Sequence, residues 1–321
     1  MIIGNMKRNI YSYSKLWMIS FVLMGAACTN QVEDAIPVSD QPIGFSVQSD
    51  WKEIPNTRLI DDNGTMKFTQ GDKVQIFGFH KPYSGAVENV QFMYDVDHQN
   101  SGQIVTYDGN NSWNYTPKRF WPKKGLLDFY ASYPCDSYNS IHYDVEKKMM
   151  AYENNLTQDL LYGLATDWNR EKNPTVSIWM VHALAKVRII LDESLGDIGQ
   201  VQVWGYKTGH FSPMSNNDGV PVWIIDDDKT PISVDFRKYE GKVDEELKNN
   251  NSVTVFILRD KITGLKMWNS VGQEIDASEE IKKHTFLAGK VYNLTISKSN
   301  GVRKKNTNSR SIAMSVRCVS E

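Results

Sequence analysis

The sequence has little of what most catalytic and metal-binding sites are made of. Its 321 residues include three cysteines and six histidines, and the histidines show neither HxH nor HxxxH spacing. Closely spaced histidines and cysteines are the usual zinc ligands, so no metal site is expected. No GxSxG, P-loop or dinucleotide-binding motif occurs either. The sequence therefore predicts neither an enzyme nor a bound cofactor.

An excess of positive charge is also missing. The formal net charge is -2, and three of the basic residues lie within the first 27, which hold no acidic one. A chain without those residues therefore has a more negative net charge. Nucleic-acid-binding proteins carry a surplus of Lys and Arg on one face, so no nucleic-acid partner is expected.

The first 27 residues have the pattern of an export signal. Three basic residues precede an apolar segment from Leu16 to Met24, which is too short to span a bilayer. Small residues then lead to Cys28, and this resembles a bacterial lipobox, in which the cysteine takes a diacylglycerol. Gly25 stands where leucine is usual. Cys28 is the expected lipidation site, and an ordinary signal peptide cut near Ala27 is the alternative.

Two further cysteines, Cys135 and Cys318, remain when Cys28 is lipidated. Counting alone allows one disulfide between them. Two separate thiols are the alternative.

Short strands account for most of the remaining pattern. Aromatic residues make up 11% of the chain, turn residues recur at short intervals, and no run of ten residues carries a helical apolar stripe. The fold class expected is all-β. Strands are predicted over residues 43–49, 73–79, 90–96, 103–107, 112–115, 126–133, 141–145, 160–166, 201–206, 220–225, 232–236, 253–258, 265–268 and 291–297.

The longest near-continuous apolar run after the N-terminus covers residues 175–192. Apolar and polar residues alternate twice within it, with a break at His182 and Ala183, which predicts two strands joined at a corner. A single helix is the alternative. A histidine at such a corner is more often a hydrogen-bonded core residue than a catalyst. Turn residues after Asp192 predict a domain boundary before Gln200.

Three other stretches resemble a binding or structural element, but the pattern is weak or allows two interpretations. Trp113, Phe120 and Trp121 stand among prolines and predict an aromatic plug at a sandwich edge, with a carbohydrate-stacking platform as the alternative. Residues 95–99 have the first part of a calcium-loop pattern but lack its later ligand and glycine. Residues 226–228 form an acidic triplet that predicts a solvated hairpin tip.

Five motifs in order along the chain carry a family resemblance. They are FTQGDKVQIFGF at 68–79, SWNYTPKRFWPKKGLLDFYASYP at 112–134, DLLYGLA at 159–165, VHALAKVRIIL at 181–191 and AGKVYNLTIS at 288–297. Together they resemble the fimbrillin family of outer-membrane lipoproteins, the subunits and accessory proteins of protease-matured pili in Gram-negative gut and oral anaerobes. The resemblance covers residues 43–297.

This resemblance implies two tandem β-sandwich domains of transthyretin-like topology, at residues 43–192 and 193–298. A lipoprotein signal peptide (1–27) and a tether (28–42) would precede them, and a linker with a terminal strand (299–321) would follow. It also implies a surface-exposed outer-membrane lipoprotein that serves as stalk, tip or anchor of a pilus. Its partners would be other fimbrial subunits, or further copies of itself, joined by strand exchange. The alternative is a surface lipoprotein that does not polymerise and binds a host glycan or protein.

In the fimbrillin family the first strand is removed by a trypsin-like cut after Arg or Lys. Here Arg58 follows the predicted strand 43–49 and lies in a turn-rich segment, and Lys52 is the other basic residue before Lys67. The bond between Arg58 and Leu59 is therefore the expected maturation site. An uncleaved surface loop is the alternative.

The tail contains a second candidate element for assembly. Residues 298–310 are basic and polar, which predicts a solvated linker. After them, apolar Ile312, Met314, Val316 and Cys318 alternate with small or charged residues, as in an amphipathic strand that adds to a sheet edge. These four residues are the donor-strand candidate. The tail also resembles the end of a separate paralogous domain, in which case it would be a relic.

Overall fold

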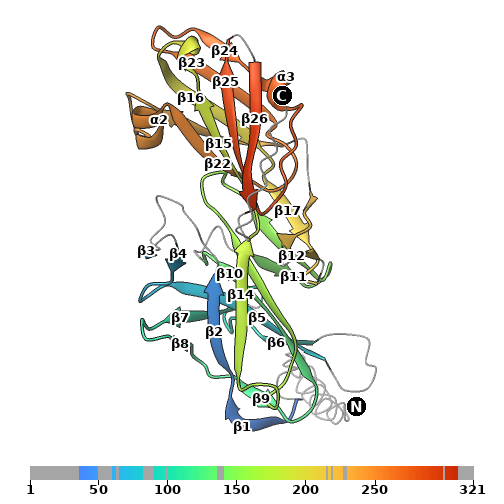
Figure 1. Ribbon diagram of the computed structural model, residues 1–321. Helices are drawn as coiled ribbons and strands as arrows, with labels where there is room; N and C mark the ends of the chain where they lie inside the picture. The colour runs from blue at the N-terminus through green and yellow to red at the C-terminus, as the bar shows by residue number, and fades with distance from the viewer. Residues whose placement is uncertain are drawn as a thin grey trace, which may run out of the picture. The chain divides into compact units, whose positions relative to one another are not determined.

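A computed structural model (Figure 1) gives the fold. It describes residues 36–49, 60–62, 65–81, 90–98, 100–135, 141–214, 216–217, 220–226, 230–298 and 301–309. Cys28, Arg58 and Leu59 lie outside these residues.

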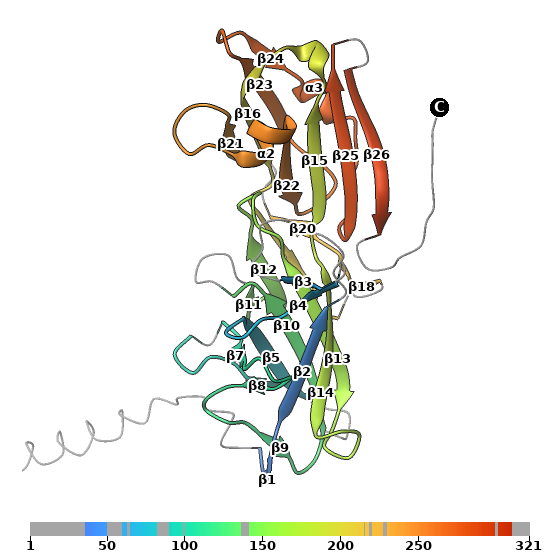
Figure 2. The ribbon, with the colours of Figure 1, turned by 60° about the vertical axis from the view of Figure 1, so that its left-hand side comes forward.

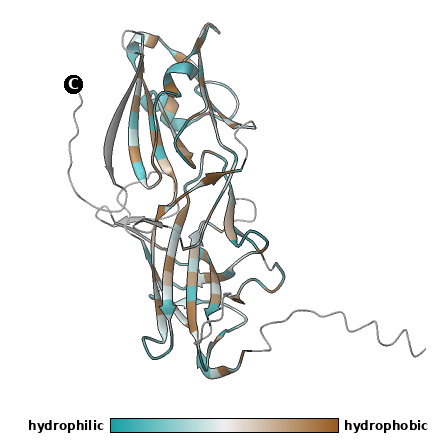
Figure 3. Ribbon diagram, turned by 90° about the vertical axis from the view of Figure 1, so that its right-hand side faces the viewer, coloured by the Kyte–Doolittle hydropathy of each residue, from teal (hydrophilic) through white to brown (hydrophobic). Residues whose placement is uncertain are grey.

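The prediction of an all-β fold is confirmed. Within the described residues the helical segments are short: η2 (Glu193–Leu195), α2 (Glu245–Asn250) and α3 (Ser278–Ile281). Hydrophobic and hydrophilic residues alternate along many strands in Figure 3, as expected for sheets with one face in a core.

The largest sheet has the order β2-β14-β13-β10-β5-β7-β8, with β6 also paired to β5. Its strands are β2 (Gly44–Ser49), β5 (Lys73–Lys81), β6 (Val90–Met93), β7 (Gln103–Tyr107), β8 (Trp113–Asn114), β10 (Leu126–Tyr133), β13 (Leu161–Trp168) and β14 (Thr175–His182). In β10 every residue from Leu127 to Ser132 is buried. This strand is therefore covered on both faces.

A four-stranded sheet packs against part of the largest sheet. Its strands are, in order, β11 (His142–Asp144), β12 (Met149–Glu153), β17 (Thr208–Phe211) and β20 (Ile224–Ile225). Tyr162 of β13 meets Phe211 of β17 edge-to-face at 4.9 Å, and Phe211 meets Trp223 at 4.8 Å. These rings belong to one buried cluster, so the two sheets share a core.

Two further four-stranded sheets share a second core. One has the order β22 (Ser252–Ile257), β15 (Ala185–Leu191), β25 (Lys290–Ser297) and β26 (Gly301–Ser309), and the first three appear side by side in Figure 2. The other has the order β21 (Ile232–Arg237), β16 (Ile198–Gly205), β23 (Gly264–Asn269) and β24 (Glu274–Asp276). Val187 of β15 and Val201 of β16 are both fully buried in the shared cluster.

Three small two-stranded sheets complete the described strands. They are β1 (Val38–Pro42) with β9 (Phe120–Pro122), β3 (Ile60–Asp62) with β4 (Thr65–Lys67), and β18 (Asn216–Asn217) with β19 (Val220–Pro221).

The corner expected within residues 175–192 is present as two strands and not a helix. β14 ends at His182, β15 begins at Ala185, and both Ala183 and Leu184 between them are buried. β14 belongs to the largest sheet, whereas β15 pairs with β22 and β25. The chain therefore passes from one pair of sheets to the other at this corner.

The division into domains at residues 192 and 193 stays a prediction, but strand pairing does not follow it. β15 lies before that point and pairs with the later strands β22 and β25. β17 lies after it and pairs with β12. Long-range pairing of this kind is not visible in local turn residues, which were the basis of the predicted boundary.

The structure has a strand where the sequence predicts a solvated linker over residues 298–310. Residues 301–309 form β26, which pairs antiparallel with β25 from Ser297 opposite Gly301 to Lys290 opposite Ser309. Basic and polar residues are well tolerated in a strand at a sheet edge, where lysine discourages unwanted pairing. Composition alone therefore does not distinguish such an edge strand from a linker.

Candidate functional site

The candidate site is the place that β2 occupies at one edge of the largest sheet. β2 lies at one edge of that sheet and runs parallel to β14, from Gly44 opposite Thr175 to Ser49 opposite Met180 (Figure 2). Parallel strands adjacent in a sheet are joined by a long crossover, and here the whole run from β3 to β13 separates the two. The first strand is thus held by tertiary pairing and not by a hairpin.

Three apolar side chains of this segment are inserted into the core. Ile43, Phe45 and Val47 are 1%, 4% and 5% exposed, while the intervening residues are half-buried. Burying one such side chain stabilises a fold by roughly 1.5 to 3 kcal/mol. The three together therefore contribute on the order of 5 to 9 kcal/mol to holding the first strand in place.

Backbone and phenol hydrogen bonds fasten the start of β2. The Ile43 amide donates to the carbonyl oxygen of Arg119 at 2.9 Å, and the Tyr115 hydroxyl donates to the carbonyl oxygen of Ile43 at 2.8 Å. Burial raises the pKa of Tyr115 to about 12, so its phenol keeps the donated proton through neutral pH. We call Tyr115 and Arg119, with the residues between them, the clasp.

β1 continues this attachment upstream. It pairs antiparallel with β9, which follows the clasp, with Val38 opposite Pro122 and Pro42 opposite Phe120. Residues 38–49 therefore contact the fold along their whole length. Their removal would uncover both the edge of β14 and the apolar space that holds Phe45.

The three aromatic residues predicted as a plug are close to this place, and both tryptophans are buried. Trp121 is fully buried, Trp113 is nearly so, and Phe120 is half-buried. Trp121 meets Phe129 edge-to-face at 6.2 Å, and Phe129 also meets Phe45 at 5.4 Å. The plug interpretation is confirmed, because buried rings offer no platform for a sugar.

The site residues inferred from the sequence stay predictions. Besides Cys28, Arg58 and Leu59, the donor-strand candidates lie outside the described residues: Ile312, Met314, Val316 and Cys318. In sequence, Arg58 falls between the end of β2 at Ser49 and the start of β3 at Ile60. A cut there would separate β1 and β2 from the rest of the chain covalently.

His182, at the corner between β14 and β15, has a carboxylate partner in the core. His182 Nδ1 and Asp159 Oδ2 lie 2.6 Å apart, and both side chains are buried. Asp159 also accepts from the Leu160 amide at 3.0 Å. The pair ties β14 to the segment before β13, as expected for a core histidine.

Across the described part of the chain, no cluster of three or more His, Cys, Asp or Glu side chains could hold a metal ion. In the same residues, no helix is long and apolar enough to cross a membrane.

The Asp226 carboxylate pairs with His210, a contact that the prediction of a solvated hairpin tip did not include.

The sequence profile described as fimbrillin-like matches residues 57–311, which is most of the chain. The chain belongs to the fimbrillin-like family. This confirms the resemblance read from the five motifs. Membership in the fimbrillin-like family makes the protein a structural one and not an enzyme. No curated protein matches the chain.

Solved structures share the fold of this fimbrillin-like chain. One is a candidate cell adhesion protein from Bacteroides uniformis, 14% identical, with a TM-score of 0.51 over 85% of this chain and 99% of that one. Another is a candidate cell adhesion protein from Bacteroides ovatus, 12% identical, with a TM-score of 0.50 over 86% of this chain and all of that one. At such identities the likeness shows a common fold.

Proposed function

We propose that this protein is a structural or adhesive subunit of a cell-surface fimbria and that its subunits join by strand exchange. Membership in the fimbrillin-like family supports the fimbrial role, and two proteins of the same fold are described as candidate cell adhesion proteins. The observation that carries the strand-exchange proposal is the place of β2. It is an edge strand, yet Phe45 and Val47 of this strand, with Ile43 just before it, insert into the core.

Loss of the first strand would create a strong binding site for another strand. The edge of β14 would expose unpaired backbone N–H and C=O groups, which readily template an added strand. The space left by Ile43, Phe45 and Val47 would accept apolar side chains at every second position. While the resident strand stays in place, it blocks that site and prevents premature assembly.

Maturation in this proposal is a cut between Arg58 and Leu59. The cut lies after β2 in sequence, so residues 38–49 are then held by non-covalent contacts such as the pairing and burial described above. The tail residues Ile312, Met314 and Val316 repeat the spacing of Ile43, Phe45 and Val47. The tail of one subunit is therefore the proposed donor for the next, and an outer-membrane lipid anchor at Cys28 would hold the precursor at the surface.

Assembly can be tested on a chain with a controlled cut. Residues 57–59 are replaced by the recognition sequence of a site-specific protease, and the purified chain is examined on unboiled gels before and after cleavage. We expect a ladder of stable polymers after cleavage, since β2 can then leave. A matched variant that also lacks residues 311–321 should be cut equally well but stay monomeric.

N-terminal sequencing of protein from the native cell surface tests the cut itself. A start at Leu59 supports maturation. If full-length lipidated protein is the one species found, and the cleaved chain stays monomeric, this copy does not polymerise. The protein would then act as a surface lipoprotein that binds a host glycan or protein.

A further inference from the structure

An exposed tryptophan lies beside the place that β2 occupies. Trp179 of β14 is 47% exposed, whereas Trp113 and Trp121 of the plug are buried. Trp179 lies opposite Gln48 of β2 on one side and opposite Leu164 of β13 on the other. Tryptophan is enriched among the residues that dominate binding at protein interfaces. Its ring is therefore a candidate contact for the strand that replaces β2.

The tail of the chain repeats the first strand position by position. Residues 43–49 read IGFSVQS, and residues 312–318 read IAMSVRC. Both segments have isoleucine, serine and valine at the first, fourth and fifth positions, a small residue at the second and a large apolar residue at the third. The main change of charge is at the sixth position, where Arg317 stands in place of the neutral Gln48.

This match implies a direction for the incoming strand. β2 runs parallel to β14, so a tail that takes over its positions in order also runs parallel. A Cβ on Gly44 would lie 3.2 Å from Thr175 Oγ1, which leaves little room beyond a methyl group, and the tail has alanine at this position. The parallel order places Arg317 opposite Trp179. The reverse order, with the same apolar positions, would place Ser311 there instead.

The tail of the same chain does not reach these positions in the parallel order. β26 ends at Ser309, opposite Lys290, and the adjacent Gly289 amide donates to the Leu184 carbonyl oxygen at 3.0 Å, just past the end of β14. Ile312 would have to lie beside the opposite end of β14. That strand is about 23 Å long at the usual rise per residue, whereas three residues span at most roughly 11 Å. A parallel donor strand therefore comes from a second copy of the chain.

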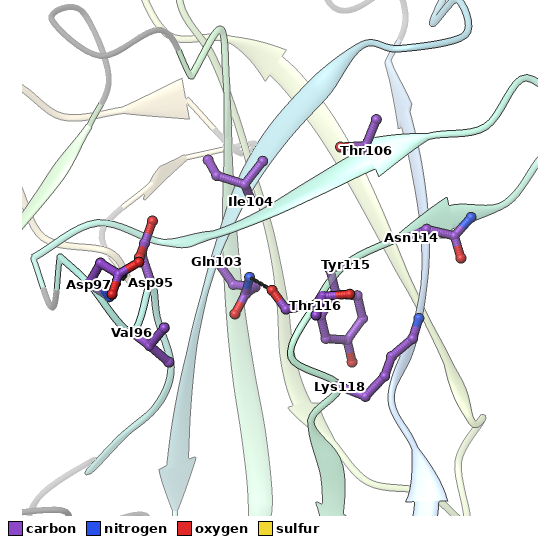
Figure 4. A pocket seen from close by; sticks show the side chains of 10 residues that line it. All are labelled: Asp95, Val96, Asp97, Gln103, Ile104, Thr106, Asn114, Tyr115, Thr116 and Lys118. Carbon is purple, nitrogen blue, oxygen red and sulfur yellow. Dashed lines mark hydrogen bonds between the residues drawn. The ribbon is translucent and has the colours of Figure 1, made fainter.

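Elsewhere the fold places cations over aromatic rings. In the pocket drawn in Figure 4, Lys118 Nζ lies 4.6 Å from the centre of the Tyr115 ring. Lys172 Nζ lies at the same distance from the Trp168 ring. Among the described residues no cation lies over Trp179, so its exposed ring can accept one from an incoming strand. Tryptophan is the best aromatic partner for a cation, and arginine is the commonest cation in such contacts.

We propose that Trp179 selects the donor strand: the tail of a second copy runs parallel to β14 and places Arg317 over the Trp179 ring. This inference rests on the strand exchange proposed above, and it adds the direction of the donor and the residue pair that recognises it. Gln48 of the resident strand has no charge to offer this ring. The contact with Arg317 therefore favours the incoming strand over β2 at this position.

The contact is tested with a peptide that carries the tail sequence. The acceptor is the cut chain that lacks residues 311–321, and the probe is a fluorescein-labelled peptide of those residues with Cys318→Ser, followed by fluorescence anisotropy. We expect Arg317→Gln in the peptide to weaken binding about threefold to fivefold. The ratio of the two affinities within one acceptor is the readout, because displacement of β2 affects both peptides equally.

Variants of the acceptor assign this ratio to one ring. In a Trp179→Leu acceptor the two peptides should bind equally well. Ser177→Ala alters another exposed residue on the same face of β14 and is the matched control, in which the full ratio should remain. A ratio that is the same in the wild-type and Trp179→Leu acceptors overturns the contact but leaves strand exchange standing. If no tail peptide binds, exchange of the tail itself fails, and this inference fails with it.

A disulfide tests the direction of the strand. Ser46 of β2 lies opposite Ser177, so a peptide with Ser315→Cys should form a disulfide with a Ser177→Cys acceptor whose native cysteines are replaced by alanine. A strand in the reverse order would place the same peptide residue opposite Thr175. Faster disulfide formation with a Thr175→Cys acceptor than with Ser177→Cys would overturn the parallel direction.

Discussion

Replacing Phe45 with alanine tests whether the first strand belongs to the core that holds the fold together. The Phe45 ring is 4% exposed and meets Tyr115 at 5.7 Å and Phe129 at 5.4 Å, both edge-to-face. Alanine would remove these contacts and leave a cavity beside Tyr115 and Phe129. The backbone pairing of β2 with β14 would remain.

The expected loss in the free energy of unfolding follows from the burial of Phe45 and from the position of β2 at a sheet edge. Removing a buried phenylalanine ring typically lowers the free energy of unfolding by about 3 to 5 kcal/mol. β2 lies at a sheet edge, so it can move partly into the cavity, and we expect a value near the lower end, about 3 kcal/mol. Gln48→Ala alters an exposed side chain of the same strand and should change stability by about 0.5 kcal/mol or less.

The assay is urea unfolding of the uncut chain, followed by tryptophan fluorescence. The two variants and the wild type are compared at the first transition. A Phe45→Ala loss no larger than that of Gln48→Ala would refute the reasoning, because β2 would then contribute little to the core. In the assembly assay, Phe45→Ala should also polymerise faster after cleavage, since its first strand dissociates more readily.

Two further predictions concern the clasp and the N-terminus. Tyr115→Phe removes the hydrogen bond to the Ile43 carbonyl and should cost about 1 kcal/mol in urea unfolding at neutral pH. Burial raises the pKa of Tyr115 in the folded chain from 10.0 to about 12. The contribution of the protonated phenol to folding stability is therefore complete below pH 10 and is lost as the pH rises through about 12. The difference in the free energy of unfolding between wild type and Tyr115→Phe should therefore disappear in that alkaline range. A difference that persists would contradict the role given to the Tyr115 hydrogen bond. Cys28→Ala should abolish labelling with radioactive palmitate and release the protein from membranes, whereas unchanged labelling would exclude lipidation at Cys28.

Strands with a strong alternating pattern could be found from the sequence alone. The predicted ranges for β7 and β10 agree with the structure at both ends, and the corner between β14 and β15 is where the alternation breaks. Short strands such as β9 and β24 were missed. Three residues hold too little periodicity to be recognised, and these strands form because neighbours supply their hydrogen bonds.

The family and the all-β class followed from local information. Alternation of apolar residues, turn residues at short intervals and five motifs in order are all properties of the chain read along its length. These features can be read from neighbouring residues, because a strand with one buried face needs an apolar residue at every second position. The aromatic plug was found for a similar reason, since large rings are usually buried.

Tertiary structure decided which distant residues meet. The partnership of β2 with β14 and the pairing of His182 with Asp159 join segments that no local pattern relates. The basic segment 301–309 became an edge strand because β25 offers it an unpaired side. Pairing and burial depend on what the rest of the fold places beside a residue, so these features required the structure.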